Sequence, residues 1–123
     1  MPVSILHVGV PLDHPLVPVE DRQRLRKRLD ELQQGMRAAG YDYEILSISP
    51  DGGIEAFKDR LRTKPCDGLL IGGGVVGHPE MTYFMEQIVD ATHEVVPKAK
   101  IMFHSHAVDV LTTVERWFPS AAG

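Results

Sequence analysis

Apolar residues gather in four short runs that predict β-strands. Val3–Val10 and Leu69–Ile71 are nearly continuous apolar runs, which is typical of strands buried on both faces. Tyr41–Ile48 alternates apolar with acidic positions before an apolar end, and this alternation predicts a strand with one wet face at a sheet edge. Lys100–His104 is the fourth expected strand.

Between these runs, apolar residues repeat every three or four positions, which is the spacing of a helix that buries one side. The repeats predict four helices, over about Val19–Ala39, Ile54–Thr63, Pro79–Val95 and Ala107–Phe118.

The first expected helix combines an apolar stripe with a basic flank. Gly40 stands where a helix commonly ends, and Arg22–Arg28 is a basic cluster that contains five of the 13 lysines and arginines. No aromatic residues are interleaved with these basic ones, so we interpret them as a solvated face rather than a nucleic-acid site. The stripe consists of Leu25, Leu29, Leu32, Met36 and Ala39.

Strands and helices alternate strictly along the chain, which predicts an α/β fold with a parallel sheet. Short, right-handed connections favour a four-stranded sheet in the order 2-1-3-4, with helices on both faces in a three-layer sandwich. We expect residues 1–123 to form a single α/β domain, with 119–123 as a frayed tail. In this order the first and third strands are neighbours, and the turns that follow them border one crevice.

Composition narrows the class of protein. The single cysteine, Cys66, excludes an internal disulfide bond, fits a reducing compartment and is interpreted as a small buried hydrophobe. A net charge of −4 argues against nucleic acid as a partner. The first ten residues lack the basic start of a signal peptide and turn polar too soon for a membrane span, so we expect a cytoplasmic location.

Glycines are densest directly after the third expected strand. A strand that passes through glycines into a helix presents bare backbone N–H groups to an anion, and His78 adds a side chain that can carry positive charge. Glycines also permit close packing without any ligand, so both interpretations stay open. The residues concerned are Gly72, Gly73, Gly74 and Gly77.

The predicted architecture resembles the flavodoxin-like and Rossmann-like three-layer sandwiches over essentially the whole chain. Within it, Gly72, Gly74 and Gly77 are similar to the G-x-G-x-x-G fingerprint of dinucleotide-binding proteins. That fingerprint belongs to the first strand, whereas here it follows the third. The next strand ends in Phe103–His104, without the acidic residue that would bind ribose. No specific family is matched by motif, and no cofactor is assigned.

Histidines concentrate at the same expected edge of the sheet. Histidine and carboxylate side chains bind zinc and similar metals, and histidine is the usual general base near neutral pH. Loop histidines are also common without a function, and Ser105 is interpreted as a cap of the last helix. His7 interrupts the first strand and is interpreted as a satisfied core residue. The candidate metal ligands are Asp13, His14, His78, His104 and His106.

Three functional hypotheses follow. The first is a small anionic or phosphorylated ligand in the strand-end crevice, contacted by Asp13, His14, Gly72, Gly73, Gly74, Gly77 and His78. The second is a histidine- and aspartate-dependent hydrolase or lyase, with or without a metal, whose catalytic candidates are His14, His104 and His106. The third is a non-catalytic module that self-associates as a homodimer through Trp117 and Phe118. Neither nucleic acid nor a membrane is an expected partner.

Overall fold

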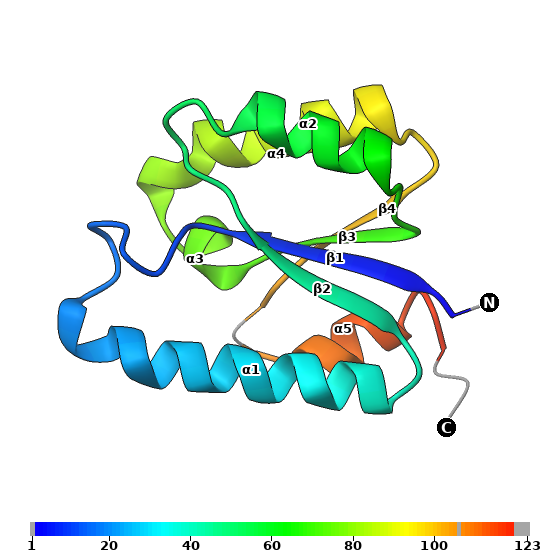
Figure 1. Ribbon diagram of the computed structural model, residues 1–123, viewed down its shortest axis with the longest axis horizontal. Coiled ribbons are helices and arrows are strands. Elements are labelled where there is room, and N and C mark those ends of the chain that lie inside the picture. The colour runs from blue at the N-terminus through cyan, green and yellow to red at the C-terminus, as the bar shows by residue number, and fades with distance from the viewer. Residues whose placement is uncertain (1, 106, 120–123) are drawn as a thin grey trace.

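Four parallel strands form one sheet in the order β2-β1-β3-β4, which confirms the predicted fold class. The computed structural model describes residues 2–105 and 107–119. In the register of β1 and β3, Val8 lies beside Ile71, so the two central strands end at the same edge of the sheet (Figure 1). The strands are β1 (Ser4–Gly9), β2 (Asp42–Ser47), β3 (Gly68–Ile71) and β4 (Lys100–Phe103).

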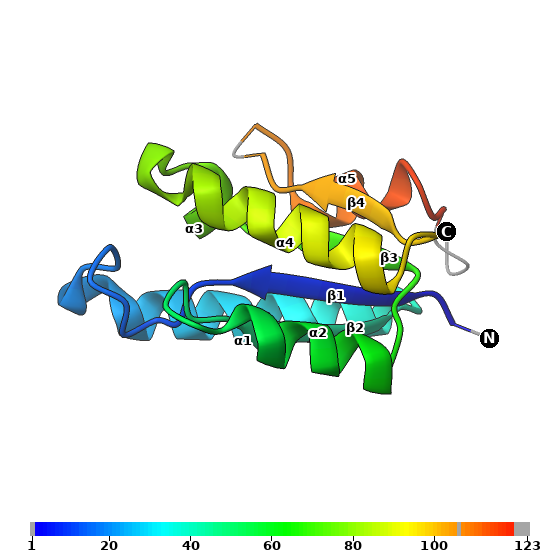
Figure 2. The same ribbon diagram turned by 90° about the horizontal axis from the view of Figure 1, so that it is seen from above.

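Helices cover both faces of the sheet and produce three layers (Figures 1 and 2). On one face lie α1 (Arg22–Ala38) and α5 (Val110–Glu115). On the other lie α2 (Ile54–Thr63) and α4 (Thr82–Val95). Three shorter helices join them, namely η1 (Val19–Asp21), α3 (Gly73–Val76) and η2 (Pro79–Met81).

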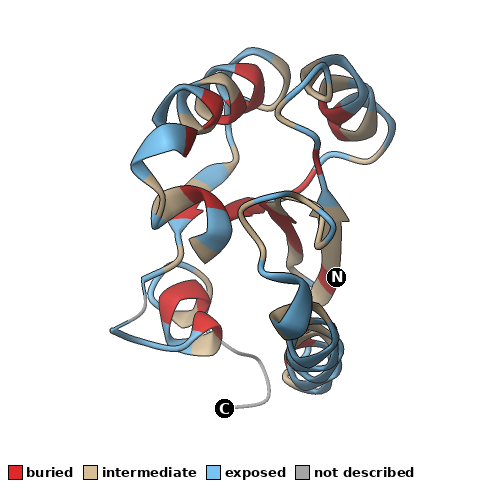
Figure 3. Ribbon diagram, turned by 90° about the vertical axis from the view of Figure 1, so that its left-hand side faces the viewer, coloured by how far each residue is buried: buried red, intermediate tan, exposed pale blue. Residues whose placement is uncertain are grey.

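The core is divided between the two faces because successive side chains of a strand point to opposite sides. Leu6 and Val8 pack toward α2 and α4. Ile5 and Leu70 pack toward α1 and α5. His7 shares the face of Ile5, so its imidazole lies on the α1 and α5 side. Figure 3, which looks onto the carboxyl ends of the strands, shows buried residues in the middle layer and on the inner sides of the helices.

Cys66 belongs to the core between the sheet and the α2 and α4 layer. Burial raises the pKa of its thiol to about 11, so the thiol stays protonated at neutral pH. The interpretation of Cys66 as a small buried hydrophobe is confirmed.

The glycine segment after β3 differs from the predicted loop. Gly73–Val76 form one helical turn, α3. The backbone N–H of Gly72 donates to the carbonyl of Val8 at 2.8 Å, and that of Gly77 donates to the carbonyl of Gly73 at 2.9 Å. Because these donors already bond the backbone, the expectation of bare N–H groups at Gly72 and Gly77 is wrong.

The last helix begins later than its spacing predicts. α5 starts at Val110, and the side chain of Asp109 caps it by accepting a hydrogen bond from the backbone N–H of Thr112 at 2.8 Å. Ser105 instead accepts from the backbone N–H of Ala107 at 3.1 Å, within the preceding loop. The expected capping role of Ser105 is therefore wrong, and His106 lies outside the described residues.

Candidate functional site

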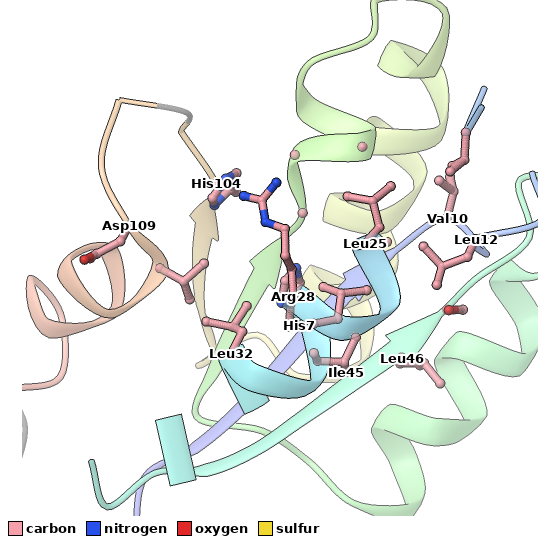
Figure 4. A pocket seen from close by; sticks show the side chains of 18 of the residues that line it. His7, Val10, Leu12, Leu25, Arg28, Leu32, Ile45, Leu46, His104 and Asp109 are labelled. Atoms are coloured by element: carbon pink, nitrogen blue, oxygen red, sulfur yellow. The ribbon is translucent and has the colours of Figure 1, made fainter. Parts of the chain in front are cut away.

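A cavity of about 700 Å³ lies on the α1 and α5 face, at the carboxyl ends of β1 and β3 (Figure 4). Small-molecule sites commonly have volumes of about 300–1,000 Å³. Val10 and Leu12, which follow β1, and Gly72 and Gly73, which follow β3, all line the cavity. The prediction that these two turns border one crevice is confirmed.

Most of the cavity wall is apolar, and α1 supplies much of it. Leu25, Leu29 and Leu32 line the cavity and are only partly buried. Met36, one turn further along the same stripe, is fully buried. The stripe therefore joins the core at its C-terminal end and borders the cavity toward its N-terminal end. Further apolar wall residues are Val10, Leu12, Ile45 and Val110.

The charged side chains that line the cavity come from α1 and from the residue that precedes α5. Arg28, an exposed residue of α1, extends its guanidinium toward His104 (Figure 4). Asp109 also lines the cavity, but its carboxylate caps α5 and points away from Arg28 (Figure 4). Within the described part of the chain, no carboxylate forms an ion pair with Arg28. Its positive charge is therefore available to a ligand.

His7 lies in the part of the cavity nearest the sheet. Its residue surface is 7% exposed, and its Nδ1 lies 2.6 Å from the hydroxyl oxygen of Tyr43 on β2. The two rings meet edge to face, with centroids 5.9 Å apart. Burial, with a smaller contribution from nearby His104, lowers the pKa of His7 to about 4. The imidazole is therefore neutral at pH 7.

Gly72 provides the space that the His7 ring occupies. A Cβ atom added at Gly72 would lie 2.8 Å from Nε2 of His7 and 3.1 Å from the carbonyl oxygen of Val8. A Cβ atom at Gly74 would meet only Val10, at an ordinary 3.5 Å. Close packing, one of the two interpretations left open for these glycines, therefore accounts for Gly72.

The structure gathers only some of the predicted site residues. Gly72, Gly73, Gly74 and His104 line the cavity, whereas Asp13, His14, Gly77 and His78 are not among the residues that line it. Nδ1 of His14 accepts a hydrogen bond from the backbone N–H of Leu16 at 3.1 Å. Nδ1 of His78 lies 2.8 Å from the carbonyl oxygen of Gly74, so it donates to that oxygen. Both rings are thus engaged within their own loops.

The metal hypothesis gains no support from the described residues. Among them, no group of three or more histidine, cysteine, aspartate or glutamate side chains is placed to hold a metal ion. His106, one of the candidate ligands, lies outside this part of the chain.

Sequence reasoning missed two residues of the cavity, His7 and Arg28. The interpretation of His7 as a core residue agrees with its burial and its hydrogen bond to Tyr43, but it does not predict a place in the cavity wall. The interpretation of Arg28 as part of a solvated helix face does not predict one either. The sequence contains a feature that could have identified each residue. A histidine near the end of a central strand lies close to the edge of the sheet where the strands have their carboxyl ends. Arg28 stands three residues after Leu25 and four before Leu32, so it borders the apolar stripe of the helix.

The two aromatic residues proposed for self-association lie in different surroundings. Phe118 packs against the core on the α1 and α5 face. Trp117 is 54% exposed, and Nζ of Lys100 lies 5.6 Å from the centroid of its ring. Packing within the chain therefore accounts for Phe118, whereas the ring of Trp117 is largely exposed to solvent.

Comparisons of the chain with protein-family models, with curated proteins and with solved structures found no match. Within residues 2–105 and 107–119, no helix combines the length and apolar character needed to span a membrane.

Proposed function

We propose that this protein binds a small anionic organic molecule in the cavity on the α1 and α5 face. The cavity lies where the chain winds from the central pair β1 and β3 toward opposite edges of the sheet. In doubly wound folds of the flavodoxin-like or Rossmann-like kind, which this architecture resembles, ligands bind at that point. The proposal keeps the expected cytoplasmic location.

One observation carries the proposal: three of the five residues in the apolar stripe of the first helix line the cavity and are only partly buried. Leu25, Leu29 and Leu32 would be buried more completely by an apolar ligand. Such burial contributes roughly 25 cal/mol per Å² of apolar surface removed from water.

The anionic character follows from Arg28. It lies beside the leucines on the same side of α1, and its guanidinium extends across the cavity. A guanidinium binds carboxylate, sulfonate and phosphate oxygens with charge-assisted hydrogen bonds. We therefore expect the acidic group of the ligand near Arg28 and its apolar body between α1 and the sheet.

The fluorescence of anilinonaphthalene sulfonate tests this proposal. This molecule joins an apolar ring system to one negative charge, and its emission increases in apolar surroundings. We expect a saturable increase with the folded protein. The variant Arg28→Met should bind about fivefold more weakly, since an exposed ion pair contributes up to about 1 kcal/mol.

Arg26→Met is the matched control, because Arg26 is an exposed residue of α1 that does not line the cavity. It makes the same change in net charge and should bind as the unsubstituted protein does. The proposal fails if fluorescence does not saturate, or if the two variants weaken binding equally.

A further inference from the structure

The largely buried residue His7 lines the cavity and carries one ring nitrogen that no described residue bonds. His7 is more than nine-tenths buried and lines the cavity. The hydrogen bond described for its ring is the one between Nδ1 and the hydroxyl of Tyr43, so no described residue bonds Nε2. A ligand that supplies a hydrogen-bond partner to a polar atom in so little contact with water stabilises the complex.

Tyr43 determines which nitrogen of His7 carries the proton. The phenol is completely buried, and burial raises its pKa, so the hydroxyl keeps its proton. Within the described residues, its hydrogen bond is to Nδ1 of His7. The hydroxyl therefore donates to Nδ1, and the neutral imidazole carries its proton on Nε2. Nε2–H is therefore a hydrogen-bond donor, and it lies close to Gly72, which also lines the cavity.

The charge of the wall limits the charge of the ligand. Among the described lining residues, Arg28 carries a positive charge and Asp109 a negative one at pH 7. The carboxylate of Asp109 is already engaged as the cap of α5. His7 is neutral at pH 7, because burial and His104 lower its pKa. A single negative charge can pair with Arg28, whereas a second would enter a largely apolar cavity without compensation.

We propose that the ligand is an apolar monocarboxylate, with its carboxylate between the Nε2–H of His7 and the guanidinium of Arg28. Its hydrocarbon part lies along Leu25, Leu29 and Leu32. Tyr43 acts as a positioning residue, because it fixes the His7 tautomer without touching the ligand. This inference rests on the proposed function, and it specifies that the acidic group of the ligand is a carboxylate.

Three ligands of equal chain length separate the possibilities: octanoate, octanol and octyl phosphate. Calorimetric titration at about pH 8 keeps the phosphate dianionic, since its second pKa is about 6. We expect octanoate to bind about tenfold more tightly than octanol, because it adds a charge-assisted hydrogen bond and an ion pair. Octanoate should also bind more tightly than octyl phosphate. Equal binding of octanoate and octanol, or tighter binding of octyl phosphate, overturns the inference.

Two variants assign the preference to His7. Tyr43→Phe keeps the imidazole, whereas the double variant His7→Leu with Tyr43→Phe removes the donor and leaves no unpaired hydroxyl behind. The single variant should keep at least part of the preference for octanoate over octanol, because it keeps the imidazole. In the double variant this preference should be severalfold smaller than in the single variant. Octanol binding reports that the cavity is intact in each. An unchanged preference in the double variant contradicts the inference.

Nitrogen NMR of the His7 ring gives a test that needs no variant to fold. We expect an unprotonated Nδ1 and a protonated Nε2, and the Nε2–H resonance should shift when octanoate is added. Protonation of Nδ1, or no response to bound octanoate, contradicts the inference.

If neither octanoate nor octanol binds, the proposed function itself fails. If both bind equally, only the carboxylate assignment fails.

Discussion

At the scale of single residues, His7 shows how a buried strand can hold a polar group at the edge of a cavity. Its Nδ1 is hydrogen-bonded to the hydroxyl of Tyr43. Its ring packs beside Gly72, where there is no side chain to occupy the same space. The three residues belong to three adjacent strands or strand ends. Their arrangement therefore depends on the sheet order as well as on their own chemistry.

The lowered pKa of His7 predicts a loss of stability in acid. The folded protein holds His7 neutral down to about pH 4, whereas the unfolded chain binds a proton below its ordinary pKa of 6.5. The contribution of neutral His7 to the free energy of unfolding is therefore fully present above pH 6.5 and is lost as the pH falls toward 4. A pKa lowered from 6.5 to about 4 corresponds to about 3 kcal/mol in the free energy of unfolding. The titratable and charged groups around the ring are Tyr43, which is hydrogen-bonded to it, His104, which lowers its pKa, and Arg28, which lines the same cavity.

Urea unfolding of the protein and of His7→Asn, measured from pH 7 to pH 4, checks this prediction. The asparagine amide does not titrate, and it offers an oxygen to the Tyr43 hydroxyl. We expect the protein to lose about 3 kcal/mol relative to the variant across this range. Parallel pH dependence of the two proteins would show that His7 does not titrate with a lowered pKa.

The surroundings of Gly72 and Gly74 predict that alanine destabilises the fold at Gly72 and has little effect at Gly74. At Gly72 the new Cβ would lie 2.8 Å from the His7 ring and 3.1 Å from a backbone oxygen, so Gly72→Ala should destabilise the fold by about 1–3 kcal/mol. At Gly74 the nearest atom is 3.5 Å away, and alanine favours the helical turn, so stability should change by less than about 1 kcal/mol. Thermal unfolding of the two variants measures the difference. Equal melting temperatures would show that the His7 ring does not depend on the space at Gly72.

At the scale of elements, α1 is the helix whose ends and composition are easiest to test. Gly35 is exposed within the helix, and a Cβ atom there would meet nothing within 4 Å. Gly40 follows the helix with φ of 99°, a left-handed conformation that alanine rarely adopts. The position after the helix thus needs glycine, whereas the interior position does not.

Alanine at these two positions should therefore shift stability in opposite directions. Gly35→Ala should stabilise the protein by about 0.5–1 kcal/mol, because alanine is the better helix former. Gly40→Ala should destabilise it by about 1 kcal/mol or more, because the left-handed backbone strains the new side chain. Urea unfolding of both variants gives the two values. A stabilising Gly40→Ala would contradict the helix end described here.

Strands and long helices were predicted because their apolar periodicity is strong, and Ile54–Thr63 matches α2 residue for residue. The turn α3 was missed because glycine is a poor helix former and four residues carry no periodicity. Local bonds hold this turn: the carbonyl of Gly72 accepts from Val75 at 3.0 Å and from Val76 at 3.1 Å. The late start of α5 was missed because the cap is Asp109 rather than Ser105.

At the scale of the whole molecule, the sheet order could be predicted because right-handed crossovers leave few arrangements of four parallel strands. The cavity could not be predicted from the sequence, because its volume depends on how α1 and α5 pack together on one face of the sheet. α5 has six residues and starts at Val110, so it leaves the carboxyl end of that face uncovered. The leucines of α1 border the resulting space, and periodicity alone cannot distinguish a residue facing a cavity from one in the core.

A small organic anion that binds between α1 and the sheet should perturb the residues around it at this edge of the sheet. Backbone amide NMR during titration with anilinonaphthalene sulfonate tests this expectation most directly. We expect the saturable shifts to concentrate at Gly9, Gly73, Leu29 and Val110, which line the cavity from four segments of the chain. Shifts confined to the separate groove of Phe103 and Trp117, or no saturable shifts at all, would contradict the account.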